Sequence, residues 1–482
     1  GIISILVSIF SKSRTKSLLI LKSRYKKNNR SKLIEKILGK IFFNQNLTID
    51  RQLRYSQNNQ LHQTKTMMEL VTKNGLDLND NTEINIYKDP NRLEKELYDK
   101  VGERGRVKEF REDENRVIKY IQDGYLKGEA PSFHKASKVL GEDLAQLWIR
   151  GTARNLLDYY FTSEKTKLYM GMTVIESSPE SIDSEGSAFI IPLMDSGSVF
   201  DGYWGYVKHG IWQVTEELGL LNESIGIEIN TSSVIKSIDR ESKKVMLNDG
   251  KSFDYDILIF ATDPVTPSKL IKDFKDDIVL DEIGTSGKVT AFFRNPVKWK
   301  DSNNYPDSFR FIFSNNSLNQ FEDASQNALK NSGDYFAGFI QIYPDGSAQR
   351  TMNNKESYDK LILFTKNLSY DKKADDLGKI RDEIVDTVLP YIENANDLVY
   401  SKFLTPKDLN ETFSFPKGNI DHITLTGKQN YNNRTFSDNP NNFYSYYNFP
   451  DVYYCGAGSF PCGSVAGTAG YMCSKQLVRN DH

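Results

Sequence analysis

The most constraining feature of the sequence lies near its C-terminus, where a short apolar strand leads into a glycine-rich turn and then into a helix of small residues. Residues 452–472 contain five glycines, namely Gly456, Gly458, Gly463, Gly467 and Gly470. A strand, a glycine turn and a helix N-terminus bring free N–H groups and the helix dipole to one place, which is typical of a site for an anion or a ring edge. A tight strand-to-helix turn without a ligand has the same glycine spacing, so the glycines alone leave both interpretations open.

A second group of strand signals lies in the middle of the chain. Asn248-Asp-Gly separates two alternating segments and predicts a hairpin turn. Residues 257–260 form a continuous apolar run, as expected of a parallel strand buried on both faces. This run ends in the small residues Ala261-Thr-Asp-Pro, where a cofactor or another backbone segment could approach closely.

The remaining patterns indicate several domains, since 482 residues are enough for two or three. Residues 89–160 place apolar side chains three or four apart and predict amphipathic helices. Residues 284–437 alternate strand patterns with a helix near residues 375–389, as in an α+β domain.

The net charge of −2 hides a strong asymmetry along the chain. Residues 1–54 hold 13 Lys and Arg but only Glu35 and Asp50 as acids, a local charge of +11 that leaves −13 on the rest. This basic, acid-poor composition is typical of a mitochondrial transit segment. A solvated basic helix, or an arm that binds an acidic partner or anionic lipid, has the same composition. RNA binding is a weaker alternative, because Tyr25 is the only Tyr or Trp in the arm.

No catalytic or metal-binding constellation stands out. The five histidines are scattered, and only His209 falls in a glycine-bounded turn, where we expect a loop residue rather than a site residue. The three cysteines, Cys455, Cys462 and Cys473, lack the short paired spacing of a zinc site and are expected to be packing thiols. Their odd number argues against an oxidising, secreted context, and no segment has the length of a transmembrane helix.

Four blocks of the sequence together resemble a known family. They are residues 202–210, 248–264, 404–420 and 455–470, and their order and spacing match from about Leu70 to the C-terminus. The sequence is similar to the phytoene-dehydrogenase-like flavoproteins of the amine-oxidase superfamily. Within that superfamily it most resembles the mitochondrial branch of pyridine nucleotide-disulfide oxidoreductase domain-containing proteins.

This resemblance implies an α/β fold in which a discontinuous Rossmann-type FAD domain is interleaved with an α+β substrate-type domain. The Rossmann-type parts are expected at residues 1–65, which comprise the basic arm and the first half, at 201–280 and at 441–482. The substrate-type parts are expected at residues 66–200, which are helical, and at 281–440.

The family's first phosphate-binding turn is degenerate in this sequence. In a dinucleotide fold the first glycine makes the turn, the second lets backbone approach pyrophosphate, and the third packs the helix on the strand. Here the strand of residues 2–7 is followed by Ser8, Phe10 and Ser13 in place of the three glycines. We expect Phe10 to fill the pyrophosphate site. Residues 25–31 stand in place of the second strand and carry neither β-propensity nor the carboxylate that binds the ribose.

The other half of the family's cofactor site is better preserved. If FAD is retained, the resemblance implies binding through Val234, Ala261, Gly456, Gly458 and Gly463. Glycines in tight turns are also required by the fold itself, because a Cβ at positive φ is strained with or without a ligand.

We therefore expect no bound cofactor, with FAD as the alternative, and we expect neither catalytic nor metal-binding residues. The favoured hypothesis is a flavin-oxidoreductase-derived protein that serves as a structural or accessory subunit of a mitochondrial assembly, in the matrix or on the matrix face of the inner membrane. Its partners would be other protein subunits, with an anionic membrane surface contacted through residues 12–54 as a further candidate, and not nucleic acid. The alternative is an active, phytoene-desaturase-like FAD oxidoreductase that acts on a hydrophobic substrate.

Overall fold

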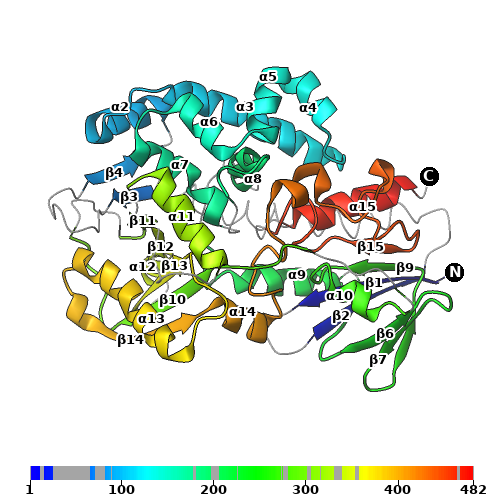
Figure 1. Cartoon of the computed structure of the whole chain (residues 1–482). Helices are drawn as coiled ribbons and strands as arrows, with labels where there is room; N and C mark the ends of the chain where they lie inside the picture. Colours follow the sequence, from blue (N-terminus) through cyan, green and yellow to red (C-terminus); the bar gives the residue numbers. More distant parts are fainter. Residues whose placement is uncertain are drawn as a thin grey trace.

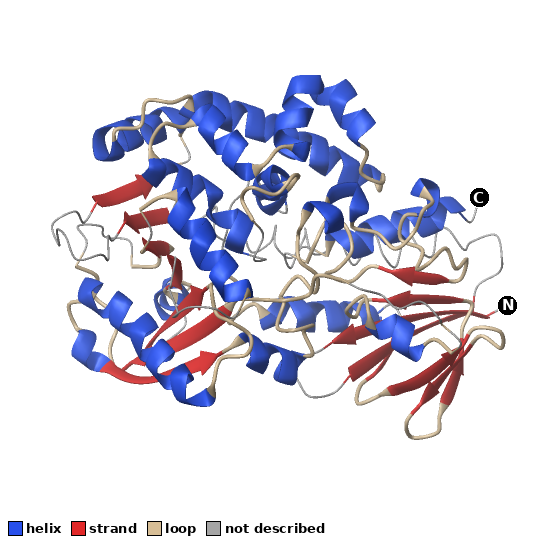
Figure 2. Ribbon diagram, viewed as in Figure 1, coloured by secondary structure: helices blue, strands red, loops and turns tan. Residues whose placement is uncertain are grey.

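The protein combines a helical layer with two main sheets. Helices gather on one side, and the sheets lie below them next to each other (Figures 1 and 2). The structure, a computed structural model, describes residues 2–10, 16–24, 66–70, 82–87, 89–176, 181–196, 206–224, 226–272, 274, 280–300, 306–314, 316–330, 339–352, 358–463 and 467–480.

The first sheet has five strands in the order β15-β9-β1-β2-β5. Its strands are β1 (Ile2–Phe10), β2 (Lys16–Arg24), β5 (Glu228–Asn230), β9 (Ile257–Phe260) and β15 (Val452–Tyr454). β9 pairs in parallel with both β1 and β15. The predicted parallel strand at residues 257–260 is therefore confirmed, and it lies between strands from the two ends of the chain.

A small three-stranded sheet lies beside the first one. It consists of β6 (Ile235–Asp239), β7 (Lys244–Leu247) and β8 (Ser252–Asp254), in that order. β7 and β8 pair antiparallel around Asn248-Asp-Gly, so the predicted hairpin is confirmed. A backbone bridge between Ile238 and Ile271 connects this sheet to the residue after the short helix α10 (Thr266–Leu270).

The second large sheet has seven strands in the order β14-β10-β13-β12-β11-β3-β4. Its strands are β3 (Thr66–Leu70), β4 (Thr82–Ile86), β10 (Gly287–Phe293), β11 (Arg310–Phe313), β12 (Phe339–Tyr343), β13 (Asp359–Thr365) and β14 (Leu398–Leu404). One face of β10 and β13 packs against α13 (Ala374–Val388) through an apolar cluster that includes Val289, Leu363 and Ile384.

The segments that form the two large sheets alternate along the sequence. The five-stranded sheet uses residues 2–24, 228–260 and 452–454, whereas the seven-stranded sheet uses residues 66–86 and 287–404. The molecule is thus an α/β protein whose Rossmann-type sheet is interleaved with a second, mixed sheet. The exact domain boundaries stay predictions.

The helical layer follows from apolar periodicity and from capping residues. It contains α2 (Pro90–Val101), α3 (Val107–Lys127), α4 (Phe133–Leu140), α5 (Glu142–Ala145), α6 (Ala153–Tyr160), α7 (Glu164–Glu176) and α8 (Ile190–Ser196). In α2, the Asp89 side chain caps the N-terminus, Gly102 ends the helix with φ 67°, and Leu93 and Leu97 are buried. The amphipathic helices predicted within residues 89–160 are confirmed.

The other helices connect or cover the sheets. They are α9 (Trp212–Ser224), α11 (Leu318–Leu329), α12 (Asp345–Thr351), α14 (Pro406–Phe413) and the C-terminal α15 (Thr468–Asn480).

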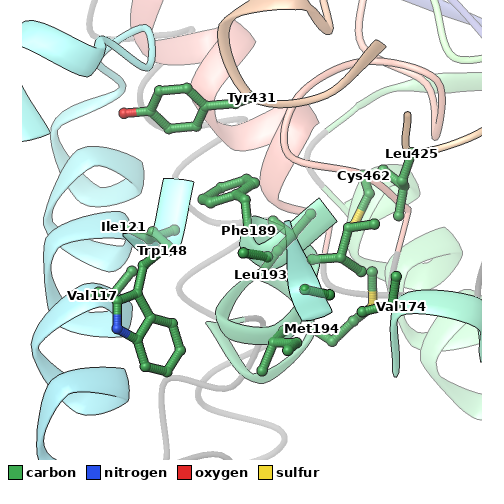
Figure 3. Packing of buried hydrophobic residues seen from close by; sticks show 14 of the residues in the cluster. Val117, Ile121, Trp148, Val174, Phe189, Leu193, Met194, Leu425, Tyr431 and Cys462 are labelled. Carbon is green, nitrogen blue, oxygen red and sulfur yellow. The ribbon is translucent and has the colours of Figure 1, made fainter. Parts of the chain in front are cut away.

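The largest apolar core joins the helical layer to the C-terminal part of the chain. Phe189 and Leu193 belong to this core, as does Trp148, which lies between α5 and α6 (Figure 3). Leu425 and Cys462, from segments far apart in the sequence, lie close together at the edge of the same cluster (Figure 3). This packing fixes the position of the glycine-rich turn relative to the helices.

Candidate functional site

The candidate site lies where the parallel strands β9 and β15 end, next to the longer strand β1. Phe260 at the end of β9 is in register with Ser8 of β1 and with Tyr454 at the end of β15. Parallel strands that end at one edge define the place where open α/β sheets bind their ligands. The segments that come after β9 and β15 are the two that the sequence singled out.

The turn after β9 is stabilised by its own side chains. The buried Asp263 carboxylate accepts hydrogen bonds from the backbone N–H groups of Val265 (3.0 Å) and Thr266 (2.8 Å), and from the Thr266 hydroxyl. The Thr262 carbonyl accepts a hydrogen bond from the Tyr454 hydroxyl at 3.2 Å. Asp263 therefore organises the start of α10.

The turn after β15 explains two of the predicted glycines. A Cβ on Gly456 would overlap the Thr262 carbonyl oxygen and lie 2.8 Å from the Tyr454 hydroxyl oxygen. A Cβ on Gly458 would lie 2.8 Å from that hydroxyl and 3.1 Å from the Pro264 ring, and the Gly458 N–H donates to the same hydroxyl at 3.1 Å. Both glycines are thus required for close approach between two turns of the protein itself.

The remaining predicted residues divide between this site and another sheet. Ala261 is half-buried and directly precedes Thr262, so it lies at the same edge. A Cβ on Gly463 would lie 3.2 Å from the Ala457 side chain, inside the same turn. Val234 precedes β6, and its carbonyl accepts a hydrogen bond from Asn248 in the three-stranded sheet. The structure therefore brings Ala261, Gly456, Gly458 and Gly463 together and places Val234 in a different element.

Arg434 links this edge to the preceding loop, and sequence reasoning missed it. Its side chain is fully buried, and it donates to the backbone carbonyls of Asp421 (3.0 Å), Gln429 (3.1 Å) and Ala457 (2.9 Å), with longer bonds to Ile423. Burial lowers the pKa of the guanidinium from its usual value. Because Ala457 lies between the two glycines, Arg434 connects the glycine turn to the preceding loop.

His422 is the second residue that sequence reasoning missed. Its ring is buried, its backbone has φ 68°, and it lies beside the backbone of Thr262. Burial lowers the pKa of His422 to about 4, while the charge of Asp263 opposes this shift and that of Arg434 adds to it. The imidazole is therefore neutral at pH 7 and forms part of the packing between the loop and the β9 turn.

The other candidates from the sequence lie elsewhere. His209 is an exposed loop residue whose N–H donates to the Gln349 side chain at 2.8 Å, as the loop interpretation predicted. Cys462 and Cys473 are buried, and all three cysteines are free thiols. Among the described residues, no group of three or more His, Cys, Asp or Glu side chains could hold a metal ion.

The first strand differs from the prediction both in its length and in the element that comes after it. The sequence predicted a strand that ends at residue 7, but β1 continues through Phe10. β2 then returns antiparallel, with Ser8 opposite Leu18 and Phe10 opposite Lys16. Ser8 and Phe10, which align with the family's first two turn glycines, thus lie within a strand, because Ile9 and Phe10 favour a strand and no glycine turns the chain out of the sheet. That Phe10 fills a pyrophosphate site stays a prediction. Ser13 lies outside the described residues.

The strand β2 was not predicted from the sequence, although it contains the apolar residues Leu18, Leu19 and Ile20. Residues 25–31, which stand in place of the family's second strand, lie outside the described residues.

These residues do not fit the phosphate end of a dinucleotide. A parallel crossover needs a dozen or more residues, usually including a helix, whereas five residues separate β1 from the antiparallel β2. Pyrophosphate binding in this fold depends on a helix N-terminus directly after the first strand. The connection from Phe10 to Lys16 is too short to provide one.

The chain is similar in sequence to curated proteins that are named as oxidoreductases. No protein-family model matches the sequence. The chain is similar to pyridine nucleotide-disulfide oxidoreductase domain-containing protein 2 of Rattus norvegicus, with 24% identity over 385 residues, which cover 72% of this chain and 64% of the relative. The Mus musculus protein of that name is 23% identical over the same shares. The predicted resemblance is thus confirmed, and the chain spans slightly less than two thirds of the length of these relatives.

Solved structures of amine oxidases align with most of the chain. A triple mutant of putrescine oxidase covers 86% of it at 11% identity, with 80% of that protein aligned and a TM-score of 0.44. Cyclohexylamine oxidase from Brevibacterium oxydans covers 87% at 12% identity, with 80% aligned and a TM-score of 0.43.

Proposed function

We propose that this protein has kept the scaffold of a flavin oxidoreductase, does not bind FAD, and serves as a structural or accessory subunit of a mitochondrial assembly. The observation that carries the proposal is the antiparallel pairing of β1 with β2, because the family's pattern has a phosphate-binding turn and a helix directly after its first strand. A dinucleotide without contacts to its pyrophosphate lacks the charge-assisted hydrogen bonds that anchor it in this fold.

The polar groups at the strand ends support the same proposal. The N–H of Cys455 donates to the Phe260 carbonyl at 2.9 Å, and the N–H of Gly458 donates to Tyr454. The carbonyl of Ala457 accepts from Arg434. These backbone groups are satisfied by the protein, so a ligand would have to break existing bonds to use them.

The accessory role and the location rest on the charge distribution. The +11 arm of residues 1–54 suits import into mitochondria or contact with an acidic protein surface. Among the described residues, no helix has both the length and the apolar character needed to cross a membrane. We favour a protein partner for the arm, with an anionic lipid surface as the second candidate.

One observation favours the alternative, an active FAD oxidoreductase that acts on a hydrophobic substrate. The parallel strands β9 and β15 end at one edge beside β1, and Ala261, Gly456 and Gly458 meet there. In this alternative, FAD would be bound only through the residues at this edge.

A thermal-shift titration with FAD separates the two. A site filled at a hundred times its dissociation constant adds about 2.7 kcal/mol to the free energy of unfolding. We expect no change in melting temperature with FAD, and a saturable rise contradicts the proposal. A variant with glycine at Ser8, Phe10 and Ser13 is expected to behave in the same way, because the ribose-binding carboxylate is also missing.

A further inference from the structure

Two of the three cysteines lie next to each other between β15 and α15. Cys455 directly follows β15, where its N–H donates to the Phe260 carbonyl at 2.9 Å. Cys473 lies in α15 and is 1% exposed. The side chain of Cys455 interacts directly with the Cys473 thiol. They are separated by 17 intervening residues in the sequence, and this segment contains the glycine turn.

A buried tyrosine holds the two segments together. The Tyr444 carbonyl accepts a hydrogen bond from the N–H of Tyr454, the residue before Cys455, at 2.9 Å. The N–H of Tyr444 donates to the side chain of Gln476 at 2.9 Å, within one turn of Cys473 on the same helix. The contact between the thiols is therefore supported on both sides by independent hydrogen bonds.

We propose that Cys455 and Cys473 form a redox pair that a hydroperoxide oxidises to a reversible intramolecular disulfide. The Cys455 thiolate attacks the peroxide, so that an S–O bond forms, the O–O bond breaks and the leaving oxygen takes a proton to become water or an alcohol. The Cys473 sulfur then attacks the Cys455 sulfenic acid, an S–S bond forms, and the S–O bond breaks to release water with the Cys473 proton. Two electrons pass from the two sulfurs to the peroxide.

The surroundings assign the two roles. Cys455 is half-buried and is the more accessible of the pair, whereas Cys473 is enclosed by the core. The interaction with Cys455, together with burial, holds the pKa of the Cys473 thiol well above its usual value. Cys455 is thus the thiol that meets the peroxide, and Cys473 is the resolving thiol. The resulting disulfide would tie α15 to the end of the five-stranded sheet.

The pair suits a reducing compartment, where disulfides are transient and serve as sensors rather than as permanent staples. The third cysteine provides a matched comparison. Cys462 is 4% exposed and packs beside Leu425 in the large apolar core (Figure 3). We expect it to stay reduced.

The test uses the full chain treated with hydrogen peroxide and then alkylated under denaturing conditions. Two of the three thiols are expected to disappear, with a mass decrease of about 2 Da, and a dithiol reductant is expected to restore both. All three cysteines fall between the tryptic sites Arg434 and Lys475, so chymotrypsin is used, because it cleaves after Tyr471 and separates Cys473 from the other two.

The Cys462→Ser variant identifies which cysteine forms the disulfide with Cys473. In this variant a linked pair of chymotryptic peptides can only join Cys455 to Cys473, and we expect the same loss of two thiols as in the unmodified protein. Three results overturn the proposal: three unreacted thiols at excess peroxide, a disulfide that includes Cys462, or oxidation of Cys455 to sulfinic acid without a disulfide. The unmodified protein gives the thiol count, and fragmentation of its linked chymotryptic peptides shows whether Cys455 or Cys462 is joined to Cys473, so the test does not depend on the folding of the variant.

Discussion

Protonation of His422 is expected to weaken the protein as the pH falls from 7 to 5. The buried imidazole has a pKa of about 4 in the folded protein, against 6.5 for the unfolded chain. Between these values the unfolded state binds the proton more strongly, so this contribution to stability is complete above pH 6.5 and is lost as the pH falls toward 4. The pKa difference is worth about 3 kcal/mol in full, of which about 2 kcal/mol is lost between pH 7 and pH 5.

The assay is urea unfolding at pH 7 and pH 5 of the wild type and of His422→Asn. Asparagine tolerates the positive φ of 68° but does not titrate. His209→Asn is the matched control, because His209 also has φ 68° but is exposed. We expect the wild type and the control to lose about 2 kcal/mol more than His422→Asn between the two pH values. An equal loss in all three proteins would refute the assignment of His422 as a buried neutral group.

Two substitutions test the packing of the candidate site. Gly456→Ala is expected to lower the free energy of unfolding by about 1–3 kcal/mol, because the new Cβ overlaps the Thr262 carbonyl. The control is Gly378→Ala, in open space within α13, which should be neutral or stabilising by up to about 1 kcal/mol. Equal effects of the two substitutions in chemical denaturation would contradict this. Arg434→Met is expected to cost about 3 kcal/mol or more, because several buried carbonyls lose their donor, and a loss below about 1 kcal/mol would show that the guanidinium does not hold the glycine turn.

Much of the fold could be predicted from local sequence patterns. The apolar run at residues 257–260 and the Asn248-Asp-Gly turn are local signals, and both elements form where they were predicted. The C-terminal strand, turn and helix also follow from a local pattern of apolar residues and glycines. The predictions are correct for these segments because the periodicity and turn residues of each segment agree with its environment in the fold.

The first strand and its partner were harder to predict. β1 was expected to end where the family turns, yet the apolar residues Ile9 and Phe10 extend it. Its pairing with β2 depends on register across a connection, which residue propensities alone do not determine. The missing glycines are thus visible in the sequence when it is set against the family pattern, but the β1–β2 hairpin is not.

The buried polar residues of the site could not be predicted from the sequence. Arg434 and His422 lie in loops between Lys417 and Asn442, and no spacing or motif distinguishes them from exposed residues. Arg434 is buried because carbonyls from two separate segments, around Asp421 and at Ala457, converge on it. Such convergence is a property of tertiary structure, whereas the glycines of the turn carry a visible signal in the sequence.

The most direct test of the central claim is the flavin content of the native protein. The full chain is purified without added cofactor, its visible absorption spectrum is recorded, and the supernatant after acid denaturation is assayed for released flavin. We predict a colourless protein and no released flavin. A yellow protein that releases FAD in a one-to-one ratio to the chain would contradict the proposal that the β1–β2 hairpin has replaced the phosphate-binding element.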